Sequence, residues 1–143
     1  MHPLTGSCHC GNIRVELTLS REPTEYTPRA CDCDFCRKHG AAYLSDADGS
    51  LSIHVKAMER LQRYRQGSGI AQMLVCGHCG VLVGGLYAED DVCYAAVNVR
   101  IIDGGANFAA SQPASPQALP DAEKIERWKR LWFAHVQLDA DCD

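Results

Sequence analysis

Seven of the nine cysteines of this chain fall into three short clusters, and their spacing constrains the fold more than any other feature. The clusters span residues 8–10, 31–36 and 76–79, with cysteines at C-x-C or C-x-x-C spacing. Such spacings allow neighbouring thiolates to bind one metal ion. An ion shared between distant clusters would tie together segments that are far apart in the sequence. The pattern therefore predicts a domain held together by metal.

The first and third clusters together supply four thiolates, from Cys8, Cys10, Cys76 and Cys79. Four thiolates fill the tetrahedral shell of a zinc ion and leave it chemically inert. We therefore predict a structural zinc site, whose binding free energy is part of the folding free energy. The alternative is that these are buried cysteines without metal, which are common core residues.

The middle cluster supplies three thiolates, from Cys31, Cys33 and Cys36. A zinc ion with three protein ligands keeps one coordination position open for water or substrate. The sequence thus predicts a second, open zinc site. Two alternatives stay open: His39 could complete the shell, or the cysteines could form a redox triad without metal.

Length and charge limit the partners that this chain can have. At 143 residues it is expected to form one domain spanning 1–143. A net charge of −4 argues against nucleic-acid binding, which requires a basic face. We interpret Arg127, Lys129 and Arg130 as a solvated helix face. No apolar run approaches the length of a membrane span, so no membrane partner is expected.

The N-terminal residues 1–6 contain no charged region followed by an apolar region, so no secretory signal is visible. A cytoplasmic location is therefore expected, and with it reduced thiols that are free to bind metal. Cys93 lies in an apolar segment and is therefore expected to be a core residue. Cys142, in a polar tail, is assigned no role.

The apolar pattern predicts mainly strands. Alternation at residues 13–19 and 51–55, and an apolar run at 92–99, are typical of strands, and the last is expected to be the final one. Residues 72–75 and 81–83 flank the third cluster as strand, tight turn and strand. That order is typical of a zinc knuckle.

The remaining segments are predicted as turns, loops and one helix. Residues 37–40 are expected to form a turn and residues 112–116 a loop. After Pro120, Asp121 is expected to cap a C-terminal helix, and the tail after Leu138 is expected to fray. The predicted fold class is therefore mainly β, with a C-terminal helix.

Three patterns occur in order along the chain: G-S-C-H-C-G at residues 6–11, C-x-C-x-x-C-R-K at 31–38 and C-x-x-C-G at 76–80. Together they resemble the glutathione-dependent formaldehyde-activating family, which includes centromere protein V. Residues 97–100 are similar as well. The resemblance implies a single β-tent domain. It also implies a structural zinc on the outer clusters and a catalytic zinc on the middle one.

The family's named reaction joins formaldehyde to the thiol of glutathione, which makes the enzyme formally a carbon–sulfur lyase. The resemblance thus implies a small thiol such as glutathione as partner. Arg37 and Lys38, beside the triad, are candidates for binding its carboxylates. The chain departs from the pattern at Asp32, where the family often has His, and Asp34 follows. Two acids there should disfavour an anionic thiol ligand.

A second hypothesis is a zinc module without catalytic activity that binds a protein. It predicts one tightly bound zinc and an exposed apolar patch, for example from Trp128 and Trp132. A helix stripe facing the core is the other interpretation of these two tryptophans. A count of bound metal separates the enzyme from the binding module.

Overall fold

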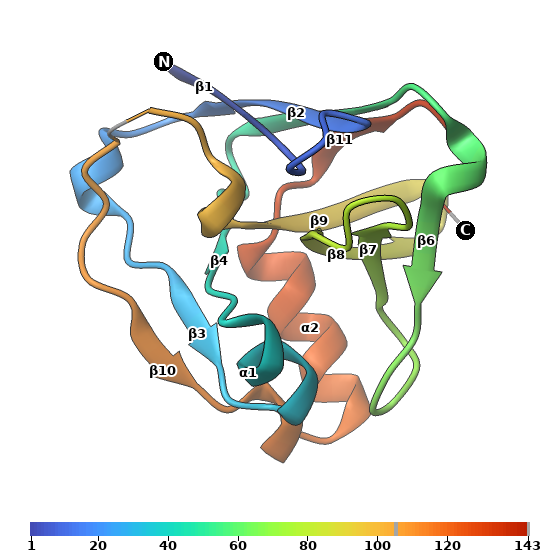
Figure 1. The fold of residues 1–143 in the computed structure, drawn as a ribbon. Coiled ribbons are helices and arrows are strands. Elements are labelled where there is room, and N and C mark those ends of the chain that lie inside the picture. The colour runs from blue at the N-terminus through green and yellow to red at the C-terminus, as the bar shows by residue number, and fades with distance from the viewer. Residues whose placement is uncertain (105, 143) are drawn as a thin grey trace.

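The computed structural model describes residues 1–104 and 106–142, so Gly105 and Asp143 lie outside the described residues. Within that part of the chain, two sheets form the molecule (Figure 1). The smaller sheet has four strands in the order β1-β2-β5-β11. In chain order these are β1 (His2–Ser7), β2 (Ile13–Leu19), β5 (Ser50–Val55) and β11 (His135–Leu138).

The larger sheet has seven strands in the order β10-β3-β4-β9-β8-β7-β6. In chain order they are β3 (Arg29–Cys31), β4 (Tyr43–Leu44), β6 (Leu61–Tyr64), β7 (Gln72–Cys76), β8 (Leu82–Glu89), β9 (Val92–Asn98) and β10 (Gln112–Ala114). Neighbouring strands are antiparallel apart from β10, which runs parallel to β3.

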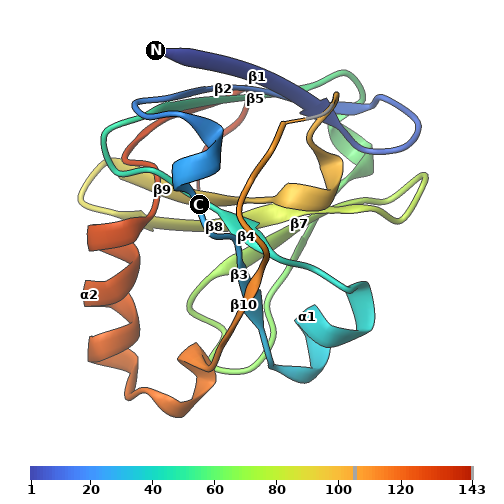
Figure 2. The same ribbon diagram turned by 90° about the vertical axis from the view of Figure 1, so that its left-hand side faces the viewer.

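Two α-helices accompany the sheets: α1 (Asp34–His39) and α2 (Asp121–Leu131). Both lie on the side of the molecule opposite β1 and β2, as do β3 and β10 (Figure 2). The mainly β class and the C-terminal helix predicted from the sequence are confirmed. Among the residues that the structure describes, no helix is both long and apolar enough to cross a membrane.

The main core lies between the two sheets, and strand periodicity explains how it forms. In β2, Ile13, Val15, Leu17 and Leu19 are buried while the residues between them are more exposed. Successive side chains of a strand point to opposite faces, so this alternation places four apolar side chains in the core. Phe133, fully buried, bridges to Ala95 of β9 and closes the core from the C-terminal side.

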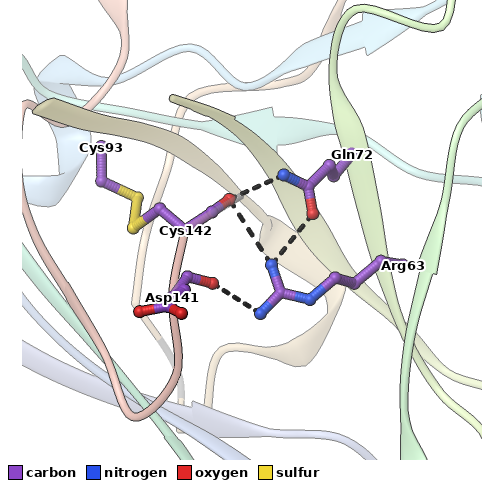
Figure 3. The surroundings of a disulfide bond; sticks show 5 residues. All are labelled: Arg63, Gln72, Cys93, Asp141 and Cys142. Atoms are coloured by element: carbon purple, nitrogen blue, oxygen red, sulfur yellow. Dashed lines mark hydrogen bonds between the residues drawn. A yellow bond between two sulfur atoms is a disulfide. The ribbon is translucent and has the colours of Figure 1, made fainter. Parts of the chain in front are cut away.

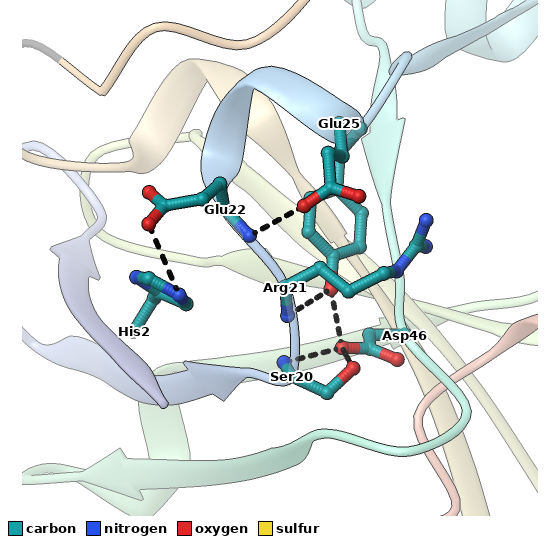
Figure 4. A network of polar contacts seen from close by, with 7 residues as sticks. His2, Ser20, Arg21, Glu22, Glu25 and Asp46 are labelled. Carbon is teal, nitrogen blue, oxygen red and sulfur yellow. Dashed lines mark hydrogen bonds and ion pairs between the residues drawn. The ribbon is translucent and has the colours of Figure 1, made fainter.

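A buried carboxylate fixes the turn before β5 to the end of β2 (Figure 4). Asp46 Oδ2 accepts hydrogen bonds from the amide and the hydroxyl of Ser20, at 2.8 and 2.7 Å, and from the hydroxyl of Tyr26 at 2.6 Å. Its Oδ1 accepts one from the amide of Asp48. Burial opposes ionisation, but these hydrogen bonds outweigh it and hold the pKa of Asp46 below its usual value.

Cys93 is a core residue, as expected, but it also forms a disulfide with Cys142, so the expectation that Cys142 has no role is wrong (Figure 3). The tail was expected to fray after Leu138, but residues 139–142 are held in place by hydrogen bonds, and residue 143 lies outside the described residues. Gln72 donates a hydrogen bond of 2.6 Å to the carbonyl oxygen of Cys142, and Arg63 donates one of 2.6 Å to that of Asp141. The sequence alone did not indicate that β11 pairs in parallel with β5 and returns the tail to β9.

Three local expectations also need correction. Residues 37–39 belong to α1, and Gly40 is its C-cap in the left-handed conformation. Residues 112–114 form β10 rather than a loop. Pro120, not Asp121, occupies the N-cap of α2, and Asp121 is the first helical residue. The strands β10 and β11 follow residue 99, which was expected to end the last strand.

Candidate metal centres and the adjacent cavity

The four outer cysteines form one cluster between the two sheets. Cys8 and Cys10 follow β1, whereas Cys76 ends β7 and Cys79 lies in the turn that leads to β8. The four sulfur atoms lie within 4.8 Å of one another. The sulfur of Cys10 lies 3.7 Å from that of Cys8 and 3.6 Å from that of Cys76. A tetrahedral zinc with Zn–S bonds of about 2.3 Å requires sulfurs about 3.8 Å apart, so the cluster fits the ion.

The two turns that carry these thiols have the same backbone conformation. A glycine follows each pair, and both Gly11 and Gly80 have positive φ angles, +83° and +82°. Each glycine amide donates back to the carbonyl oxygen of the first cysteine of its pair, at 3.2 Å to Cys8 and 2.8 Å to Cys76. Only glycine adopts this conformation without steric cost, which explains its place after each pair.

Backbone amides also point at the sulfurs. The amide of Ile13 donates to Cys8 Sγ at 3.3 Å, and that of Cys79 donates to Cys76 Sγ at 3.5 Å. Burial opposes ionisation of Cys79, but amide hydrogen bonds from Cys10 and Val81 contribute to a net lowering of its pKa to about 6. Hydrogen bonds to a thiolate favour the ionised form that binds metal.

The three middle cysteines form a second cluster at the start of α1. The sulfurs of Cys31, Cys33 and Cys36 lie within 4.8 Å of one another. Cys33 caps the helix, because its sulfur accepts from the amide of Cys36 at 3.4 Å. The turn that follows this cap brings Cys33 and Cys36 onto the same side as Cys31, which ends β3.

Polar groups from other elements complete the surroundings of the triad. The hydroxyl of Tyr43 lies 3.0 Å from Cys36 Sγ, where it can donate to a thiolate. Gln66 Nε2 lies 3.8 Å from Cys33 Sγ. A hydrogen bond from Cys36 lowers the pKa of Cys31 to about 6, while burial and the charge of Asp32 oppose this shift. The same interaction raises the pKa of Cys36.

The triad forms one wall of a cavity of about 150 Å³. Three cationic side chains also line it: Arg29 from β3, and Lys124 and Arg127 from α2. Among the residues that the structure describes, no carboxylate side chain lines this cavity. Burial, and then the positive charge of Arg127, lower the pKa of Arg29 to about 10. The cavity therefore combines thiols with an excess of positive charge.

Aromatic side chains form the apolar part of the cavity wall. Trp128 and Trp132 of the α2 segment stack with ring centroids 5.0 Å apart, and both line the cavity together with Met73. Trp128 is buried and packs on Tyr87. Trp128 is buried, as expected for a helix stripe that faces the core, and Trp132 is half-buried, so neither tryptophan is an exposed apolar residue.

The structure separates the other sequence-based candidates from this cavity. Arg37 and Lys38 lie exposed on α1 and do not line it, and Arg37 instead faces Asp34 at 3.9 Å. His39 stacks near Phe35 and is not part of the thiol cluster. Asp32 accepts hydrogen bonds from Ser115 and Gln117, so its carboxylate is already partnered by neutral groups.

Sequence reasoning missed the cations of the cavity. A signal existed for Arg29, because residues two apart in a strand share a face and Cys31 is two residues later. For Arg127 the signal was misleading: it was grouped with Lys129 and Arg130 as a solvated face. Lys129 does pair with Glu89, at 3.0 Å, and Arg130 is exposed, whereas Arg127 faces the cavity.

Comparison with known proteins agrees with this architecture. Residues 3–118 match the model of a family described as glutathione-dependent formaldehyde-activating enzyme. This chain belongs to that family. A crystal structure of a Rhodobacter sphaeroides protein is also similar, with 30% sequence identity and a TM-score of 0.53. The match covers 71% of this chain and 89% of that chain.

Membership of the formaldehyde-activating family gives a context to the two thiol clusters. All seven clustered cysteines fall within residues 3–118, as does Arg29. Helix α2, with Lys124 and Arg127, lies beyond the matched residues. The two thiol clusters are therefore in the part matched to the family, whereas the cavity wall formed by α2 lies outside it.

Proposed function

We propose that this chain is a zinc-dependent enzyme of the carbon–sulfur lyase type, which joins a thiol such as glutathione to a small aldehyde such as formaldehyde. In this reaction the thiol sulfur forms a bond to the carbonyl carbon, and the thiol proton is transferred to the carbonyl oxygen. Nothing else is consumed or released. The observation that carries the proposal is a three-thiol cluster opening onto a cationic cavity.

Each cluster has a separate role in this proposal. Cys8, Cys10, Cys76 and Cys79 hold a structural zinc. Cys31, Cys33 and Cys36 would hold a second zinc, which would activate a thiol or polarise a carbonyl oxygen. The donor sets support this division, because four soft thiolates close a tetrahedral shell and three leave it open.

The side chains around the triad hold and orient the reactants. Tyr43 donates a hydrogen bond to Cys36 and keeps this ligand in place. Arg29, Lys124 and Arg127 attract the carboxylates of the thiol substrate into the cavity. Trp132 and Met73 cover the apolar side and exclude water. The binding role predicted for Arg37 and Lys38 stays untested, and in this proposal the cavity cations replace them.

The proposal is tested by metal analysis followed by an assay with glutathione and formaldehyde. We expect about two zinc ions per chain, one of which a mild chelator removes together with the activity. One zinc per chain, with freely alkylated Cys31, Cys33 and Cys36, would favour the zinc module without catalytic activity. Cytoplasmic location and the lack of nucleic-acid binding remain predictions.

A further inference from the structure

Two arginines from distant parts of the sequence face the cavity without an acidic partner. Arg29 lies on β3, and Arg127 lies on α2, almost a hundred residues later. In the part of the chain that the structure describes, no ion pair includes either side chain. Arg29 donates one hydrogen bond of 2.6 Å, to the neutral hydroxyl of Ser45.

Placing like charges at one cavity is unfavourable unless an anion lies between them. Arg29 and Arg127 line the same cavity, and Lys124, one helical turn before Arg127, adds a third cation to its lining. A carboxylate bound there would accept charge-assisted hydrogen bonds, in the bidentate geometry that a guanidinium favours. The arrangement is therefore suited to bind an anionic group.

The helix that supplies Arg127 also supplies the apolar wall and is firmly attached to the larger sheet. Trp128 is buried against Tyr87, and Lys129 pairs with Glu89 at 3.0 Å. Gly85 of β8 leaves space for Trp132, since a Cβ atom at this glycine would lie 3.2 Å from the indole ring. Arg127 is thus presented to the cavity by a rigid element.

We propose that α2 selects the thiol: Arg127, together with Arg29, binds a carboxylate of the substrate while its sulfur lies at the triad. The inference rests on the proposed function and adds the residues that choose the substrate. Neutral thiols of similar size lack the anionic group and are therefore poor substrates. Helix α2, which supplies Arg127, lies outside the residues matched to the family, whereas Arg29 lies within them.

Binding is measured first, with a probe that has no free thiol. S-methylglutathione carries two carboxylates, and its binding to the zinc-loaded protein is followed by tryptophan fluorescence, because Trp128 and Trp132 line the cavity. We expect Arg127→Gln and Arg29→Gln each to weaken binding about tenfold to a hundredfold, the usual loss for a charge-assisted hydrogen bond. Arg127→Lys should retain part of the affinity, because it retains the charge.

Arg130→Gln is the matched control, because Arg130 lies exposed on the same helix and outside the cavity. It should bind S-methylglutathione within about twofold of the unchanged protein. Circular dichroism and zinc content establish that each variant is folded and loaded. Equal affinities for Arg127→Gln and Arg130→Gln would overturn the inference, as would the absence of saturable binding by the unchanged protein.

Kinetics separate this inference from the proposed function. With glutathione and formaldehyde, Arg127→Gln should raise KM and leave kcat nearly unchanged, whereas turnover of the neutral 2-mercaptoethanol should not respond to the substitution. An unchanged KM of Arg127→Gln for glutathione would contradict the inference and leave the proposed function intact. Arginine-dependent binding without any turnover would contradict the proposed function and support the anion site.

Discussion

The disulfide between Cys93 and Cys142 gives the most quantitative prediction for this fold. The two residues are 49 positions apart, so the bond closes a loop of about 50 residues. In the chain-entropy model, closing such a loop destabilises the unfolded state by about 4 kcal/mol, and measured values for disulfides are typically about 2–4 kcal/mol. Replacing Cys142 removes the bond without opening the core, because Cys142 is only half-buried.

We therefore expect Cys142→Ser to lower the free energy of unfolding by about 2–4 kcal/mol. The carbonyl of residue 142 still accepts from Gln72, and that of Asp141 still accepts from Arg63, so these contacts limit further loss. Urea denaturation in zinc-containing buffer measures the change. Reduction with a phosphine should destabilise the unchanged protein by the same amount and leave Cys142→Ser unaffected.

The reasoning fails in either of two ways. Alkylation of all nine cysteines in denaturant without reductant would show that the bond does not form. Alkylation of only seven cysteines in the unchanged protein would show that the bond forms. If Cys142→Ser then has the same urea midpoint and slope as the unchanged protein, the bond does not stabilise the fold.

Three further predictions follow from the buried polar groups and the thiol clusters. Asp46→Asn should cost about 2 kcal/mol at pH 7, since it weakens charge-assisted hydrogen bonds from Ser20 and Tyr26. Because the pKa of Asp46 is lowered in the folded protein, this stabilisation is present above about pH 4 and is lost as the pH falls through the folded-state pKa. The urea midpoints of the unchanged protein and of Asp46→Asn should therefore converge as the pH is lowered. Cys10→Ser should unfold the domain, whereas Cys33→Ser should abolish activity in a protein that stays folded. Circular dichroism and zinc content measure folding and metal loading, and the formaldehyde assay measures activity. The reverse pattern would mean that the two clusters have the opposite roles. Tyr43→Phe should weaken zinc binding at the triad about tenfold to a hundredfold, measured by competition with a chelator, and unchanged affinity would leave its hydrogen bond to Cys36 without a role.

The sequence predicted those features that depend on near neighbours. Strand alternation at residues 13–19 and the glycine after each outer cysteine pair depend on local backbone geometry. Both thiol clusters were foreseen as sets, because spacing within each pair limits how far the sulfurs can separate. The apolar pattern therefore indicated β2, β5, β7, β8 and β9, and the cysteine spacing indicated the residues able to hold metal.

The features that the sequence did not indicate depend on long-range topology. The parallel pairing of β11 with β5 decides that Cys142 reaches Cys93. The position of α2 relative to β3 decides that Arg127, rather than Arg37, faces the triad. Proximity to Cys36 along the chain favoured Arg37, but the turns of α1 direct that side chain to solvent. Proximity to the triad along the sequence therefore did not indicate which cationic side chains line the cavity, because the tertiary fold decides this.

The different packing of the two thiol clusters explains why one is expected to be structural and the other reactive. Cys8 and Cys76, at most 1% exposed, belong to the main core between the sheets. An ion bound there would join the loop after β1 to the β7–β8 turn, so its loss would disturb the contacts that hold the two sheets together. Cys33 and Cys36 belong to a separate, smaller apolar cluster, which borders the cavity. Changes at that site should affect fewer neighbours, and the cavity would give a substrate access to a metal bound there without opening the core.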